Sequence, residues 1–80
     1  MSASLKTKFE LAVIDKVREK RIALKYSQED LGSFLNTSRG FIGQIESSNF
    51  PTKYSLDQIN LLAKEFKCSP KDFMPDKPIF

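Results

Sequence analysis

The stretch "SQEDLGSFLNTSRGFIGQIE", residues 27–46, carries two short helical patterns on either side of a turn. Residues 28–35 form the first pattern and residues 38–46 the second. The second contains Gly40 and Gly43, and each glycine costs a helix interior about 1 kcal/mol relative to alanine. By propensity alone, a segment with two glycines is a poor helix. The presence of both glycines therefore needs an explanation.

Capping residues predict where these two helices begin and end. Ser27 offers a side-chain oxygen to the free amides of the first helix, and Asp30 three residues later is an imperfect capping-box partner. Asn36 tolerates a left-handed backbone and is expected to end that helix. Thr37 or Ser38 is then expected to cap the second helix.

The side chains of both helices separate into two faces. The apolar residues at helical spacing, expected in the core, are Leu31, Leu35, Ile42 and Ile45. The residues left on the outside are Gln28, Arg39, Gly40, Phe41, Gly43 and Gln44. We favour an exposed Phe41 side chain. The alternative is that it folds back over the helix at residues 28–35. The spacing fits a helix-turn-helix whose second helix enters the DNA major groove, although a plain helical hairpin shares the buried half of the pattern.

Helical spacing continues on the N-terminal side of this stretch. A helix is expected from Ser4 or Leu5 to Lys25, and its apolar stripe consists of Phe9, Val13, Ile14, Val17, Ala23 and Leu24. Nowhere does an alternating strand pattern persist.

Residues 47–55 form a loop by composition, after which Ser55 is expected to cap a fourth helix. The buried side of that helix is expected to hold Leu56, Ile59, Leu62, Ala63 and Phe66. Ser69 and Pro70 predict the start of a short fifth helix, with Phe73 and Met74 turned inward. The sequence therefore predicts an all-α fold of five helices.

The length and charge of the chain restrict its class. Eighty residues make one domain, and 40% hydrophobic with 29% charged residues is typical of a soluble globular protein. The formal net charge is +3, and residues 1–25 carry seven Lys or Arg against three acidic residues, a net +4. This distribution suits a polyanionic partner, and it equally fits a solvated lysine-rich helix face.

The side chains needed for enzyme chemistry are scarce. Cys68 is the one cysteine and the chain has no histidine, so we expect neither a disulfide nor a nucleophile-base pair nor a metal site. We therefore predict that the protein is not an enzyme and uses no cofactor. No apolar run is long enough to span a membrane and no secretory signal opens the chain, which indicates a cytoplasmic protein without membrane contact.

From about Val13 to Met74, the chain resembles the phage-repressor-like helix-turn-helix family of Cro and CI type, also called XRE. The residues that carry the resemblance are Arg21, Ser27, Gln28, Leu31, Ile42, Ile45, Glu46, Leu56, Ile59, Leu62, Ala63, Phe66 and the "CSP" at 68–70. Three positions depart from the family pattern: Gly32 replaces alanine, while Asn36 and Ser48 replace glycine. Loss of the methyl at Gly32 is expected only to loosen a contact, and Ser48 takes the place of the glycine that the family has at the exit from the helix at residues 38–46.

The resemblance implies a lambda-repressor-like domain of five helices, here with an extended first helix, that binds double-stranded DNA and commonly works as a homodimer. It places Gln28 against a backbone phosphate. It places four residues toward base edges, namely Arg39, Gly40, Phe41 and Gln44. It also pairs Arg21 with Glu46 in a structural ion pair.

The chemistry of these residues agrees with the implied roles. Arginine donates two hydrogen bonds to guanine, glutamine exchanges two with adenine, and an apolar side chain contacts the thymine methyl. Helix N-termini and small polar caps donate to phosphates. Thr37, Ser38, Asn49 and Lys53 are accordingly our further candidates for phosphate contact.

We divide the chain into an N-terminal extension at residues 1–11, a DNA-binding domain at 12–74 and a tail at 75–80. The extension is expected to continue the helix that ends at Lys25. Leu5 with Phe9, and Ile79 with Phe80, either pack on the domain or serve a dimer or protein partner. The predicted function is a sequence-specific transcriptional regulator that acts as a repressor. The alternative is the antitoxin of a toxin-antitoxin pair, which binds its own operator and a toxin.

Overall fold

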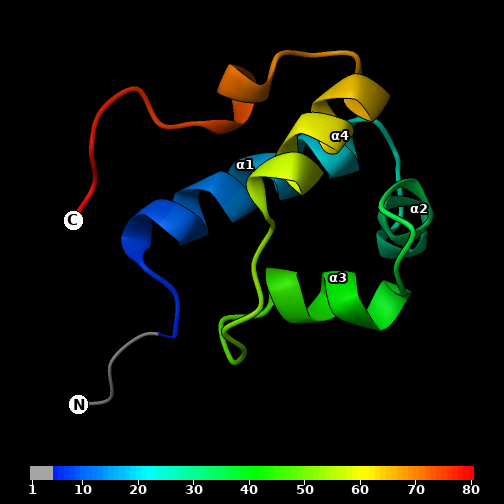
Figure 1. The fold of residues 1–80 in the computed structure, drawn as a ribbon, viewed down its shortest axis with the longest axis horizontal. Helices are drawn as coiled ribbons and strands as arrows, with labels where there is room; N and C mark the ends of the chain where they lie inside the picture. Colours follow the sequence, from blue (N-terminus) through cyan, green and yellow to red (C-terminus); the bar gives the residue numbers. More distant parts are fainter. Residues whose placement is uncertain (1–4) are drawn as a thin grey trace.

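The computed structural model describes residues 5–80 and contains α1 (Lys8–Ala23), α2 (Gln28–Phe34), α3 (Arg39–Glu46), α4 (Leu56–Phe66) and a 3-10 helix, η1 (Pro70–Phe73) (Figure 1). These residues include no strand. The all-helical prediction is therefore confirmed for residues 5–80. The expected fifth α-helix is instead a single 3-10 helix of four residues, because the backbone is already extended at Met74.

Serine side chains begin most of these helices, as the sequence predicted. Ser27, Ser55 and Ser69 each accept a backbone N–H of the first turn, and each forms a reciprocal capping box with the residue three positions on. Ser38, rather than Thr37, caps α3 and accepts the Phe41 N–H at 3.1 Å. Local hydrogen bonds thus determine the element boundaries.

The first helix is shorter than the sequence interpretation made it. It begins at Lys8 because Thr7 caps it: the Thr7 hydroxyl accepts the Glu10 N–H at 3.0 Å and the Glu10 carboxylate accepts the Thr7 N–H at 2.8 Å. Leu5 therefore lies outside the helix, and Ser4 falls outside the residues that the structure describes. At the other end, Lys25 has a left-handed backbone with φ of 63° and cannot continue the helix.

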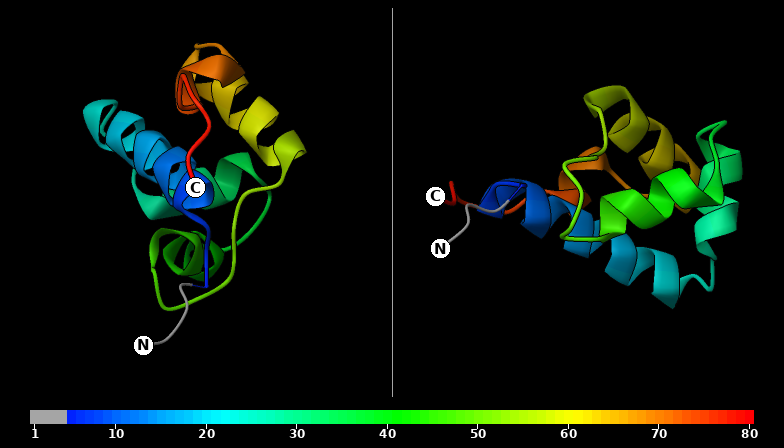
Figure 2. Two further views of the ribbon diagram at one scale, coloured as in Figure 1. Left: turned by 90° about the vertical axis from the view of Figure 1, so that its left-hand side faces the viewer. Right: turned by 90° about the horizontal axis from the view of Figure 1, so that it is seen from below.

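The core lies where α1, α2, α3, α4 and η1 meet. Its buried residues are Val13, Ile14, Val17, Leu31, Ile42, Ile45, Ile59, Leu62, Ala63, Phe66 and Phe73. Helix α1 crosses the middle of the molecule, with α4 and η1 on one side and α3 on the opposite side (Figures 1 and 2). Helix α3 thereby forms one outer face of the domain.

Some residues expected in the core are exposed. Leu56, the first residue of α4, is 81% exposed. The buried residues of α1 are Val13, Ile14, Val17 and Arg21, so Ala23 and Leu24 fall outside the buried stripe. Phe9, in the first turn of α1, is also partly in solvent. No helix within residues 5–80 is both long and apolar enough to cross a bilayer.

Candidate nucleic-acid interface

A tight turn sets α3 against α2. Asn36 has φ of 55°, the left-handed conformation that was expected of it, and the Thr37 N–H donates to the Gly32 carbonyl at 2.7 Å. A Cβ added at the buried Gly32 would lie 3.0 Å from the Thr37 carbonyl oxygen and from the Ser38 carbonyl carbon. A methyl at this position would require the backbone of the turn to give by a few tenths of an ångström, so the glycine matches a close approach of the two segments.

Helix α3 is anchored on one side and open on the other. Ile42 and Ile45 are fully buried, whereas Arg39, Gly40 and Gln44 are exposed. Within residues 5–80 the Arg39 side chain has neither a hydrogen bond nor an ion pair. The amides in the first turn of a helix also lack partners inside the helix. The outer face therefore presents unpaired donors.

Phe41 does not project freely from this face. Its side chain is partly buried and packs against the core cluster, so the exposed orientation that we favoured is wrong. Its neighbour Ile42 is fully buried in the core cluster, and Phe41 packs at the edge of that cluster. An apolar contact from Phe41 to a base would be limited to the part of its ring that remains in solvent.

Gln44 is connected to the loop that follows α3. Its side-chain Oε1 accepts a hydrogen bond from the Thr52 hydroxyl at 3.0 Å. Among residues 5–80, no acceptor is bonded to the amide N–H groups of Gln44. Thr52 was not a candidate from the sequence, because no local pattern connects residues that are eight positions apart across a loop.

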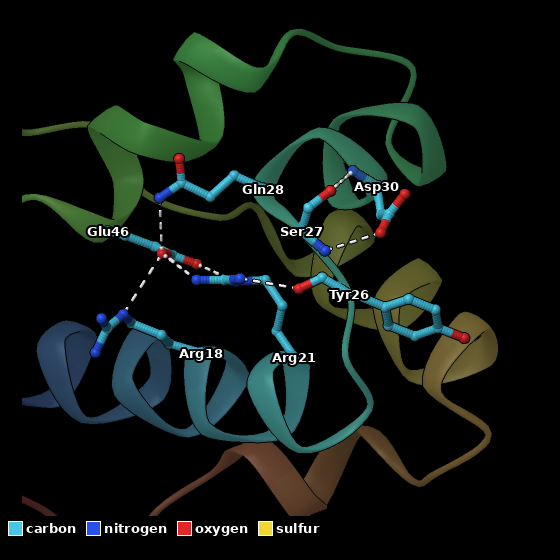
Figure 3. Close-up of polar contacts among 7 residues, drawn as sticks. All are labelled: Arg18, Arg21, Tyr26, Ser27, Gln28, Asp30 and Glu46. Atoms are coloured by element: carbon cyan, nitrogen blue, oxygen red, sulfur yellow. Dashed lines mark hydrogen bonds and ion pairs between the residues drawn. The ribbon is translucent and has the colours of Figure 1, made fainter.

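A polar cluster fastens the C-terminal end of α3 to α1 and α2 (Figure 3). Arg21 Nε and Nη2 each donate to the Glu46 carboxylate at 2.9 Å, and Arg21 Nη1 donates to the Tyr26 carbonyl at 2.9 Å. Gln28 Nε2 donates to Glu46 Oε1 at 3.0 Å, and Arg18 Nε lies 3.6 Å from the same atom. The Glu46 side chain is only 5% exposed. Gln28, expected on a phosphate, donates its side-chain amide to Glu46 in the free protein.

The opposite side of the same helix end is held by Lys6, which the sequence interpretation missed. Lys6 is 3% exposed, and its Nζ donates to the carbonyls of Gln44, Ile45 and Ser47 at 3.2, 2.5 and 2.6 Å. Burial lowers the pKa of the Lys6 ammonium, and the nearby Glu10 carboxylate opposes that shift. No sequence pattern marks Lys6, because its partners lie 38 to 41 positions away.

The other candidates for phosphate contact lie at two places. Thr37, partly buried, and Ser38, exposed, lie at the N-terminus of α3. Asn49 and Lys53 are exposed on the loop that follows α3. Lys53 pairs with Glu10 at 2.5 Å, and this hydrogen bond is the main reason why the pKa of the Glu10 carboxyl is lowered.

Within residues 5–80, the side chains that bind metals or act as nucleophiles are not grouped into a site. Residues 5–80 contain no cluster of three or more His, Cys, Asp or Glu that could hold a metal ion. Burial raises the pKa of the Cys68 thiol, which disfavours the reactive thiolate. Burial likewise raises the pKa of Tyr54, whose hydroxyl is enclosed and has no hydrogen-bond partner in residues 5–80.

Comparison with known families identifies the motif. A family model described as Helix-turn-helix matches residues 17–73, most of the 80-residue chain. Comparisons with curated proteins and with solved structures found no match. The matched segment runs from Val17 in α1 through the last residue of η1, so it contains α2, α3 and the turn between them. The chain therefore belongs to the Cro/CI-type, or XRE, family of helix-turn-helix DNA-binding regulators.

Proposed function

We propose that this protein is a sequence-specific transcriptional repressor that reads the major groove of double-stranded DNA with α3. The observation that carries the proposal is the contrast between the two sides of this helix. Ile42 and Ile45 are buried, while Arg39, Gly40 and Gln44 face solvent. Unpaired donors on a firmly anchored helix are what direct readout of base edges requires.

The polar side chains define the expected contacts. Arg39 is free to donate two hydrogen bonds to guanine O6 and N7. Because Thr52 occupies one acceptor site on Gln44, the glutamine presents chiefly N–H donors, which suit guanine O6 and N7 or thymine O4. Its remaining lone pair still permits the adenine contact expected from the sequence.

The phosphate contacts come from the ends of the two helices. Backbone amides at the N-terminus of α2, beginning at Gln28, and at the N-terminus of α3, beside Ser38, suit phosphate oxygens. The side chains of Thr37, Asn49 and Lys53 would add to them. For Lys53, contact with a phosphate requires release of its ion pair with Glu10.

We propose a homodimer as the working form. Two copies related by a two-fold axis would present their α3 helices to half-sites about 34 Å apart, one turn of duplex. Affinity should fall with increasing salt, because each phosphate contact releases counterions. Occupation of the operator by such a dimer is the simplest route to repression.

Selection of bound sequences from a random duplex library at fixed salt tests this function. We expect enrichment of a two-fold-symmetric site, together with a dimer in sedimentation of the complex. A selected site without symmetry would contradict the dimer. Absence of any enrichment would contradict sequence-specific binding.

An antitoxin is the second candidate, and an apolar groove favours it. The groove lies between residues 6–9 and 75–80, and Phe80 beside it is 98% exposed. Such a groove suits a small protein partner in addition to DNA. Co-purification with a small partner, lost when Phe9 and Phe80 are replaced by serine, would support this function. A protein that purifies alone and represses by itself would contradict it.

A further inference from the structure

The C-terminal end of α3 is only partly closed by its own backbone, in which the Ser47 N–H donates to the Gln44 carbonyl at 3.2 Å. The last four C=O groups of a helix have no partner inside it, and a glycine just beyond the end commonly supplies the compensating turn. Here Ser47 has an extended backbone, with φ of −97° and ψ of 135°, and Ser48 follows it. The last turn of α3 contains no basic residue.

Lys6 supplies further donors to this helix end. Its ammonium has three N–H donors, and it contacts three carbonyls at or beside the end of α3, those of Gln44, Ile45 and Ser47. Its positive charge lies at the negative end of the helix dipole. Lys6 is 3% exposed, and its hydrogen bond to the Ile45 carbonyl is buried.

The Lys6 contact complements the Glu46 cluster. Arg21 and Gln28 hold the Glu46 side chain from α1 and α2, whereas Lys6 holds backbone oxygens of the same turn from the N-terminal segment. The turn held in this way contains Gln44, one of the proposed base-contacting residues. A shift of the backbone at Gln44 would therefore move its side chain against the DNA.

We propose that Lys6 is a positioning residue of the DNA interface, which caps the C-terminus of α3 in place of a glycine and so fixes the pose of Gln44. The capping role concerns the free protein. The effect on recognition rests on the proposed DNA-binding function.

The test compares Lys6→Met with Lys8→Met, a matched variant that removes the same charge from an exposed position two residues away. Amide hydrogen exchange of the free protein and affinity for the selected duplex are measured for both. We expect Lys6→Met to accelerate exchange in the C-terminal half of α3 and to weaken specific binding about tenfold, with an unchanged slope of affinity against salt. Lys8→Met should leave exchange in α3 unchanged.

A second variant separates capping from general stability. Adding Ser48→Gly to Lys6→Met supplies the glycine that normally closes a helix end, and it should restore both slow exchange and specific affinity. If Lys6→Met does not fold, the double variant should fold. A double variant that remains unfolded or remains unprotected overturns the capping role.

The remaining outcomes are equally decisive. Unchanged exchange in Lys6→Met overturns the proposal. Loss of about one phosphate contact from the salt slope would show that Lys6 leaves the helix end to bind DNA, which also overturns it. If the wild-type protein selects no duplex, the proposed function and the recognition role both fail, whereas the exchange data still decide whether Lys6 is a cap.

Discussion

The two ends of α3 differ in how far their polar groups are satisfied. At the N-terminal end, Ser38 caps the helix, while Arg39 and Gly40 face solvent and the Arg39 side chain has no partner within residues 5–80. At the C-terminal end, Glu46 accepts hydrogen bonds from two side chains and Lys6 covers the carbonyls. The N-terminal end, with unpaired polar groups, is called the open end below. The C-terminal end, whose polar groups are bonded within the protein, is called the closed end.

This difference explains how a short, glycine-containing helix can serve as a reading surface. A side chain that is left unpaired for a ligand, such as that of Arg39, adds no hydrogen bond or ion pair to the stability of the fold. Buried contacts at the other end and beneath the helix therefore have to hold it. Interactions at the closed end should affect folding most, and the unpaired Arg39 side chain at the open end should affect DNA binding alone.

The largest effect is expected at the closed end, from Glu46→Ala. This change strands the Arg21 guanidinium, whose side chain is 11% exposed, and it should destabilise the fold by about 3–5 kcal/mol. Thermal unfolding and DNA titration should show the melting temperature and the affinity falling together. Glu19→Ala, at a side chain 72% exposed, is the matched control. An unchanged melting temperature in Glu46→Ala would rule out a stabilising ion pair.

At the open end, Arg39→Ala should change binding and leave folding intact. We expect a loss of about 1–3 kcal/mol in binding free energy, confined to one base pair of the site, because a bidentate contact to guanine is removed. Affinities for single-base variants of the selected duplex measure this, with the exposed Lys64→Ala as the control. An equal loss on every sequence would make Arg39 a phosphate contact.

Gly32, beneath the turn, is expected to tolerate a side chain less well than Gly40 on the open face. Gly32→Ala would press a methyl against backbone atoms at 3.0 Å, so its free energy of unfolding should be lower than that of Gly40→Ala by about 1–3 kcal/mol. Urea unfolding of both variants gives this difference. Equal stability of the two would mean that the turn moves aside at little cost.

The smallest effect, and the one of opposite sign, is expected from Gly40→Ala. The new Cβ would meet only the Ser38 hydroxyl oxygen at 3.8 Å, so the variant should gain up to about 1 kcal/mol of stability from helix propensity. It should nevertheless bind DNA more weakly if the backbone approaches the duplex here. Stronger or unchanged binding would show that Gly40 faces away from DNA.

Much of this fold was predictable from local sequence. Ser27, Ser38 and Ser55 begin their helices because a capping hydroxyl acts on amides two or three residues away. The start of α1 was predictable too, since Thr7 and Glu10 form a recognisable capping box that our interpretation overlooked. The outward position of Arg39 and Gln44 followed from helical spacing once Ile42 and Ile45 were assigned to the core.

The sequence by itself determined where α2, α3 and α4 begin, the turn between α2 and α3, and the outward position of Arg39 and Gln44, because all of these depend on neighbours within a few positions. Only the tertiary structure decided that Phe41 packs at the core edge, that Leu56 is exposed and that Lys6 closes α3. These outcomes depend on which distant segments come together, and no periodic pattern records that. The buried lysine is the clearest case, since a single charged residue near the N-terminus acquires its role solely from carbonyls nearly forty positions away.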